Sequence, residues 1–139
     1  MIIEKLQPSY LQQVVALQQQ IVPYPIDPES AAELYNTMQY RDDCCVMVVR
    51  DNDTILGSVS GFCCRGLAGS FLAIEDLIIQ ESLRGRGIGT QLMAAIHEFG
   101  KNAGCSYAIL VSSGFRKQAH HFYEKIGYTE EVRGFRKDL

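Results

Sequence analysis

Residues 74–90 read IEDLIIQESLRGRGIGT. The first six residues are mostly apolar and predict a buried strand, whereas apolar residues at helical spacing from Ile88 onward predict a helix. Between them, Gly85, Gly87 and Gly89 predict a tight turn that opens the helix. A strand that passes through a glycine turn into a helix presents unpaired backbone N–H groups beside the positive end of the helix dipole. The stretch therefore predicts a phosphate-binding site, to which Arg84 and Arg86 add positive charge.

The usual nucleotide-binding motifs do not fit this turn. No Gly-Lys-Ser/Thr sequence is present, which excludes the nucleoside-triphosphate loop. Thr90 stands where the dinucleotide motif G-x-G-x-x-G needs its third glycine, and no acidic residue follows at the ribose position. The phosphate-bearing ligand is therefore of another class.

The rest of the chain predicts a mixed α/β (α+β) protein with a largely antiparallel first half. Turn residues and apolar runs divide it into short strands and amphipathic helices. The expected strands are 1–6, 44–49, 55–64, 71–80, 107–111, 128–132 and 135–139, and the expected helices are 8–22, 27–40, 88–104 and 119–126. Repeats, linkers and low-complexity segments are lacking, so we expect a single domain over residues 1–139.

Composition narrows the class of protein. The 139 residues are 47% hydrophobic and 21% charged, with a formal net charge of −3. This balance supports a buried core and gives no general attraction for nucleic acid. No apolar run approaches the roughly 20 residues of a membrane helix, and the first residues do not form a signal segment. We expect a cytoplasmic protein without a membrane or nucleic-acid partner.

Five cysteines are present: Cys44, Cys45, Cys63, Cys64 and Cys105. Four of them form two adjacent pairs in apolar, strand-like segments. Adjacent cysteines are poor disulfide partners for each other, and the spacing does not suit zinc. We expect reduced cysteines that serve as small core side chains, and no metal site.

Two motifs together resemble one family. The pattern Arg84-x-x-Gly87-x-Gly89 resembles the acetyl-CoA pyrophosphate motif of the GCN5-related N-acetyltransferase (GNAT) family, and residues 119–128, AHHFYEKIGY, resemble its A-x-x-F-Y-x-x-x-G-[FY] helix. The order of predicted elements also agrees along nearly the whole chain. Residues 115–139 are most similar to members that act on small amines, including aminoalkylphosphonate acetyltransferases.

The resemblance implies a fold and a cofactor site. The implied fold is a mixed, mostly antiparallel central sheet flanked by helices, in which the strands near 74–80 and 106–112 splay apart. The pantetheine arm of acetyl-CoA would lie in that gap, and the pyrophosphate would bind the amides of the glycine turn. Many members carry Asn where this chain has Arg116. The implied cofactor contacts are Leu77, Ile78, Ile79, Arg84, Gly85, Arg86, Gly87, Ile88, Gly89, Thr90 and Arg116.

Acyl transfer to an amine needs a base and an acid. An ammonium of pKa ~10 must lose a proton, and the leaving thiolate must gain one. Glu75 is the candidate base, on the strand face expected to carry Leu77 and Ile79, and Asp76 on the opposite face is the second choice. Tyr123 resembles the general acid of the family. A structural ion pair or an edge carboxylate for Glu75 and a packed core position for Tyr123 are the alternatives.

We therefore expect an acetyl-CoA-dependent N-acetyltransferase that transfers an acetyl group to a primary amine, of a small molecule, by direct transfer through a ternary complex. A lysine or N-terminal protein acetyltransferase and a non-catalytic acyl-CoA-binding module are the alternatives. The acceptor would lie against residues 22–30 and 130–134, where Glu29, Glu130 and Glu131 favour a cation and Arg133 opposes it. Family members are often dimers, so a homodimer is a further expectation.

Overall fold

The computed structural model describes residues 1–112 and 117–139. It divides into two compact units, Met1–Ile109 and Leu110–Leu139, and each is described by itself. Among the described residues, none of the helices combines the length and the apolar character that a membrane span requires.

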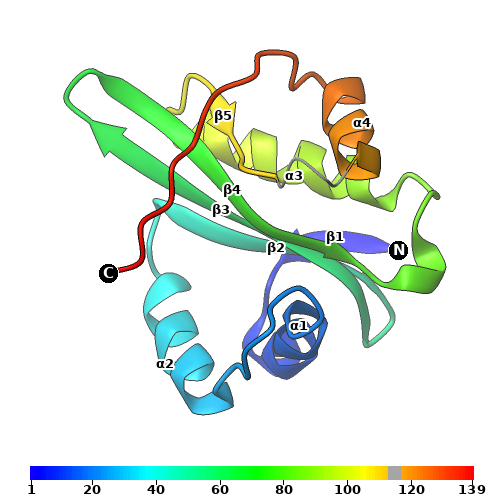
Figure 1. The fold of residues 1–139 in the computed structure, drawn as a ribbon. Helices are drawn as coiled ribbons and strands as arrows, with labels where there is room; N and C mark the ends of the chain where they lie inside the picture. Colours follow the sequence, from blue (N-terminus) through cyan, green and yellow to red (C-terminus); the bar gives the residue numbers. More distant parts are fainter. Residues whose placement is uncertain (113–116) are drawn as a thin grey trace. The chain divides into compact units, whose positions relative to one another are not determined.

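A five-stranded sheet forms the centre of the first unit (Figure 1). Its strands follow the order β1-β2-β3-β4-β5, the first three pairings are antiparallel, and β4 and β5 run parallel. The strands are β1 (Ile2–Lys5), β2 (Cys44–Asp51), β3 (Thr54–Gly66), β4 (Gly69–Ile79) and β5 (Ala108–Ile109). The predicted mixed, mostly antiparallel sheet is confirmed.

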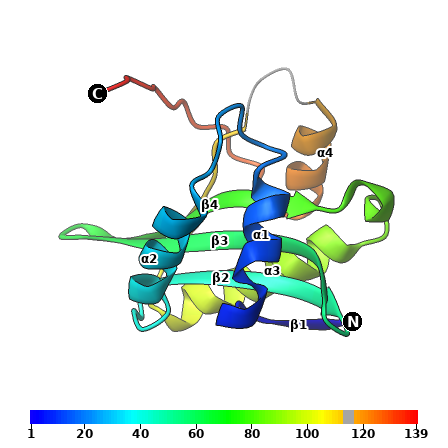
Figure 2. The same cartoon turned by 90° about the horizontal axis from the view of Figure 1, so that it is seen from below.

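Helices cover both faces of this sheet (Figures 1 and 2). A 3-10 turn leads into α1 (Leu11–Gln18), which lies with α2 (Pro28–Met38) on one face, while α3 (Ile88–Asn102) covers the other. The Asp27 side chain caps α2 by accepting a hydrogen bond from the Ser30 N–H, as expected for Asp before a proline-initiated helix. The core under α1 and α2 consists of Leu6, Val14, Leu17, Tyr35, Val48, Ile55 and Ile78.

The pairing between β4 and β5 is short. β5 pairs only Ala108 with Leu72 and Ile109 with Ala73, whereas the predicted strand covered residues 107–111. Within residues 1–109, the part of β4 beyond Ala73 therefore has no neighbouring strand on this edge. The expected separation of the two strands requires this arrangement.

A bulge reverses the faces of β4 half-way along the strand. Ser60 pairs with Glu75 and Ser58 with Ile78, so two residues of β4 oppose Val59 alone. Asp76 is one of these two and adopts a left-handed φ of 55°. An inserted residue of this kind shifts the side-chain alternation by one position.

The packing shows the reversal directly. Leu72 faces α3, because a Cβ added at Gly100 of that helix would lie 2.7 Å from the Leu72 Cδ2 atom. Ile78 would share this face in a regular strand, yet it packs in the core under α1 with Val14. The two residues therefore lie on opposite faces although they are an even number apart.

The second unit contains α4 (Lys117–Lys125) and the C-terminal tail. Residues 129–139 are exposed throughout and contain no strand, so the predicted closing strands 128–132 and 135–139 are wrong. Val132 and Phe135 gave the segment its strand-like pattern. A strand also needs a neighbour to accept its backbone hydrogen bonds, and the described part of this unit provides none.

Candidate functional site

The glycine turn between β4 and α3 adopts the predicted geometry. Gly85 and Gly87 have φ of 79° and 80°, in the left-handed region that other residues avoid. Gly87 is the N-cap of α3, and its lack of a side chain leaves the first-turn amides without a side-chain acceptor from the cap. An added Cβ at either glycine would meet no atom within 4 Å, so backbone conformation and not crowding requires glycine here.

This turn can hold an anion. It opens a 15-residue helix, whose N-terminus carries partial positive charge. Ile88 is 3% exposed and anchors the helix start in the core, while Arg84 and Arg86 are exposed beside the turn. The Arg84 Nε–H also donates to the Ile79 carbonyl at 3.3 Å, which holds this side chain near the end of β4. Apart from the buried Ile88, the predicted residues 84–90 are therefore at least partly exposed, in the turn and the first turn of α3.

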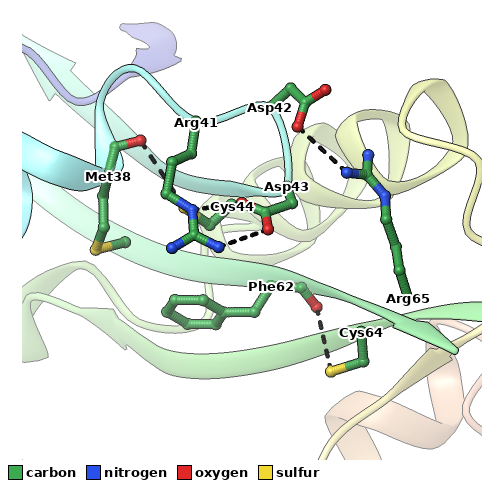
Figure 3. Close-up of polar contacts among 8 residues, drawn as sticks. All are labelled: Met38, Arg41, Asp42, Asp43, Cys44, Phe62, Cys64 and Arg65. Atoms are coloured by element: carbon green, nitrogen blue, oxygen red, sulfur yellow. Dashed lines mark hydrogen bonds and ion pairs between the residues drawn. The ribbon is translucent and has the colours of Figure 1, made fainter.

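Two other arginines are neutralised by neighbouring carboxylates (Figure 3). Arg41 binds Asp43 with both Nε and Nη2, at 2.8 and 2.6 Å, and lowers the pKa of that carboxyl. Arg65 at the end of β3 pairs with Asp42 at 3.2 Å. These pairs leave the glycine turn as the better site for a multiply charged anion.

The bulge corrects the predicted orientation of Glu75. Leu77 and Ile79 share the α3 face, since Ile79 lies beside Val49 on the side of the sheet opposite to Ile78. Glu75 lies three residues after Leu72, which faces α3, so the Glu75 side chain points to the α1–α2 face. The expectation that it shares a face with Leu77 and Ile79 is therefore wrong, because the extra residue at Asp76 separates them.

Both carboxyls at the bulge have raised pKa values. Glu75 and Asp76 are exposed, yet partial desolvation by the surrounding protein raises the pKa of Glu75, and the neighbouring Asp76 carboxylate raises it further. Partial desolvation also raises the pKa of Asp76. A base whose pKa moves toward neutrality is better matched to proton transfer near neutral pH.

Tyr123 lies on α4 in the second unit. Its ring stacks on Phe122 with centroids 5.3 Å apart and meets the edge of Tyr128 at 5.9 Å. The Tyr128 N–H donates to the Tyr123 carbonyl at 3.0 Å, which fixes the turn after the helix. Burial and the neighbouring Tyr123 raise the pKa of Tyr128 to about 12. Tyr123 is thus part of an ordered aromatic cluster at the end of α4.

The remaining predictions concern Arg116, a metal site and the cysteines. Arg116 lies outside the described residues. The described part of the chain holds no group of three or more His, Cys, Asp or Glu side chains suited to a metal. Cys44 and Cys45 are buried as expected, but Cys64 is exposed, so the prediction of a core position is wrong for it.

Sequence reasoning missed the bulge. Its signal was present: Glu75 and Asp76 are adjacent polar residues inside an otherwise apolar strand, where strict alternation allows only one polar residue at a time. Sequence reasoning also missed the approach of Cys63 to Cys105, for which the local pattern carries no signal.

A family model described as the acetyltransferase (GNAT) family matches residues 11–128, most of the chain. The chain belongs to the GNAT family. The fold agrees with this assignment: the solved structure of an aminoglycoside N-acetyltransferase in complex with CoA superposes with a TM-score of 0.83 at 19% identity, covering 99% of this chain and 95% of that one.

Two relatives carry named activities. This GNAT chain is 38% identical over 66 residues to a glucosamine 6-phosphate N-acetyltransferase of Trypanosoma brucei brucei. It is 35% identical over 66 residues to an aminoalkylphosphonate N-acetyltransferase of Salmonella typhimurium. Each alignment covers 48% of this chain and 43% of the relative, so the chain spans less than half the length of these two proteins.

Proposed function

We propose that this GNAT protein is an acetyl-CoA-dependent N-acetyltransferase that acetylates the primary amine of a small molecule by direct transfer in a ternary complex. The observation that carries the proposal is the glycine turn that precedes the 15-residue helix α3. Gly85 and Gly87 of this turn adopt left-handed backbone conformations. The whole of residues 1–139 would act as one catalytic domain.

The residues present suit acetyl-CoA as co-substrate. The amides of residues 84–90 would bind the pyrophosphate, with Arg84 and Arg86 at its edge. The edge of β4 beyond Ala73, which has no neighbouring strand within residues 1–109, would bind the pantetheine arm through the backbone of Leu77, Ile78 and Ile79. A backbone contact leaves Ile78 free to keep its side chain in the core, where it is 4% exposed.

Glu75 is the proposed base. The Glu75 side chain lies on the α1–α2 face of the sheet, which is the face opposite to α3. The carboxylate would accept the ammonium proton, directly or through water, and the freed amine would attack the thioester carbonyl. A backbone N–H near Leu77 or Ile78 would stabilise the oxyanion.

Tyr123 is the proposed acid. A phenol of ordinary pKa ~10 matches a departing thiolate in basicity, so it can donate its proton as the carbon–sulfur bond breaks. Tyr123→Phe should lower kcat by about 100-fold or more, in the range typical of general acids, and leave CoA affinity unchanged. Tyr128→Phe is the matched control on the same aromatic cluster. Wild-type turnover by Tyr123→Phe would remove Tyr123 from the mechanism.

The acceptor is best found with paired amines. The two named relatives act on amines that carry a phosphate or phosphonate, so the panel should contain glucosamine 6-phosphate with glucosamine, and aminoethylphosphonate with ethanolamine. Product formation should be followed by mass spectrometry, because thiol reagents would also react with the five cysteines. Lysine peptides test the protein-acceptor alternative. CoA binding without acetylation of any amine would support a binding module instead.

The homodimer remains a prediction. Sedimentation of the full chain with and without CoA would measure its oligomeric state.

A further inference from the structure

Two cysteines that are distant in the sequence meet in the first unit. Cys63 lies in β3 and Cys105 follows α3, yet their Sγ atoms are 3.2 Å apart, with the Cys105 thiol donating to the Cys63 sulfur. Backbone hydrogen bonds hold both ends: the Cys63 N–H donates to the Asp43 carbonyl at 2.7 Å, and the Cys105 N–H donates to the Gly100 carbonyl at 2.9 Å. The contact is therefore built into the fold.

We propose that Cys63 and Cys105 form a modification site, at which a small disulfide such as glutathione disulfide oxidises the pair to an intramolecular disulfide. Both thiols are half-buried, so each remains partly open to a reagent. The bond would join β3 to the segment that leads into β5.

The order of the two steps follows from the surroundings. Burial raises the pKa of Cys63, so Cys63 is the poorer first nucleophile of the two. The Cys105 thiolate attacks one sulfur of glutathione disulfide and releases one glutathione thiolate. Cys63 then loses its proton and attacks the Cys105 sulfur, which expels the second glutathione. Two protein thiols are oxidised and one glutathione disulfide is reduced to two glutathiones.

The remaining cysteines are placed differently. Cys44 and Cys45 are buried, and burial raises the pKa of Cys45 to about 11. Cys64 is exposed, and its Sγ lies 4.0 Å from the Phe62 carbonyl oxygen (Figure 3). As the next residue along β3, it points to the face opposite to Cys63. Cys64 is therefore a matched control, as a thiol on the same strand that has no partner from another element among the described residues.

The position of the pair gives the bond a structural consequence. Ser106 and Tyr107 follow Cys105 and join β4 through hydrogen bonds with Ser70 and Leu72, at 3.0 and 2.9 Å. The Phe71 and Tyr107 rings stack with centroids 5.3 Å apart. A covalent bond at Cys105 would fasten the start of β5, where pairing with β4 covers only two residues.

The test uses the full chain, reduced and then incubated with glutathione disulfide. We expect the oxidised chain to lose two hydrogen atoms in mass, to keep three alkylatable cysteines of five, and to yield a peptide linking Cys63 to Cys105. The bridge closes a loop of about 40 residues, so Tm should rise by at least about 5 °C and return on reduction. Neither result depends on acetyltransferase activity.

Variants separate this site from general thiol oxidation. Cys64→Ser should keep both the cross-link and the Tm rise, whereas Cys63→Ser and Cys105→Ser should each lose both. A cross-link that maps to other cysteines, a stable glutathione adduct at Cys105 without ring closure, or an unchanged Tm would overturn the proposal. If Cys63→Ser fails to fold, the peptide map of the wild-type chain and the Cys105→Ser variant decide the question.

Discussion

Replacing Gly87 by alanine tests the geometry on which the proposed CoA site rests. Gly87 has φ of 80°, and an L-residue in this region costs roughly 1–2 kcal/mol relative to glycine. An added Cβ meets no atom within 4 Å, so the strain is confined to the backbone. The turn of Gly87→Ala should relax in the ligand-free protein, and CoA binding would then have to restore the left-handed conformation.

The size of the effect follows from this cost. When CoA binding has to restore the strained turn, the cost of about 1–2 kcal/mol opposes binding. CoA affinity then falls by about 5- to 30-fold, because about 1.4 kcal/mol corresponds to a factor of ten. Any part of the strain that the free protein retains should appear instead as a lower free energy of unfolding. Calorimetric titration with CoA and denaturant unfolding measure the two parts separately.

Gly69→Ala is the matched control. Gly69 also has a positive φ, of 140°, with no atom within 4 Å of an added Cβ, but it is the first residue of β4, where it pairs with Gly66 of β3 beside the hairpin turn. Its replacement should lower stability and leave CoA affinity unchanged. Gly87→Asn should recover part of the lost affinity, since asparagine tolerates the left-handed region better than alanine. Equal CoA affinity in Gly87→Ala and the wild type would refute the assignment of the turn to CoA.

Two further variants probe β4 and its neighbour. Glu75→Gln should lower kcat/KM by about 100-fold, in the range of general bases. Because the pKa of Glu75 is raised and the carboxylate is the active form, wild-type activity should fall with acid at a pH above the ordinary carboxyl range, and this limb should disappear in the variant; an identical pH profile would exclude Glu75 as base. The Ser58 hydroxyl is buried without a hydrogen-bond partner among the described residues, so Ser58→Ala should leave the free energy of unfolding unchanged or raise it by about 1 kcal/mol. A loss of more than about 1 kcal/mol on urea unfolding would show that the hydroxyl has a partner.

The signals that predicted the fold were local ones. Glycines spaced around Arg86 require a turn, and the helical spacing after Ile88 requires a helix, so the segment from β4 to α3 was predicted correctly. Both signals act within a few residues and do not depend on the rest of the chain. The capping of α2 by Asp27 is equally local, because the Ser30 N–H that its side chain accepts from lies three residues away.

Features set by distant partners were not predictable in this way. The face of the sheet to which Glu75 points depends on how β4 pairs with β3. The two adjacent acidic residues indicate an irregular strand but do not show which strand carries the bulge. The meeting of Cys63 and Cys105 depends on where the end of α3 returns to the sheet. The predicted strands 128–132 and 135–139 are wrong because an apolar pattern does not provide a pairing partner.

The bulge at Asp76 also limits how this segment can change in length. Removing one residue from positions 75–77 would leave Ile78 opposite Ser58 in the core under α1, because the two residues that remain before it would pair one-to-one with Ser60 and Val59. Adding a residue there, or losing a second one, would turn Ile78 toward α3 and shift the whole glycine turn by one place relative to the sheet. Chimeras between this protein and its relatives should therefore have their junctions in the exposed hairpin near Leu67, where the sequence can change in length without such a rotation.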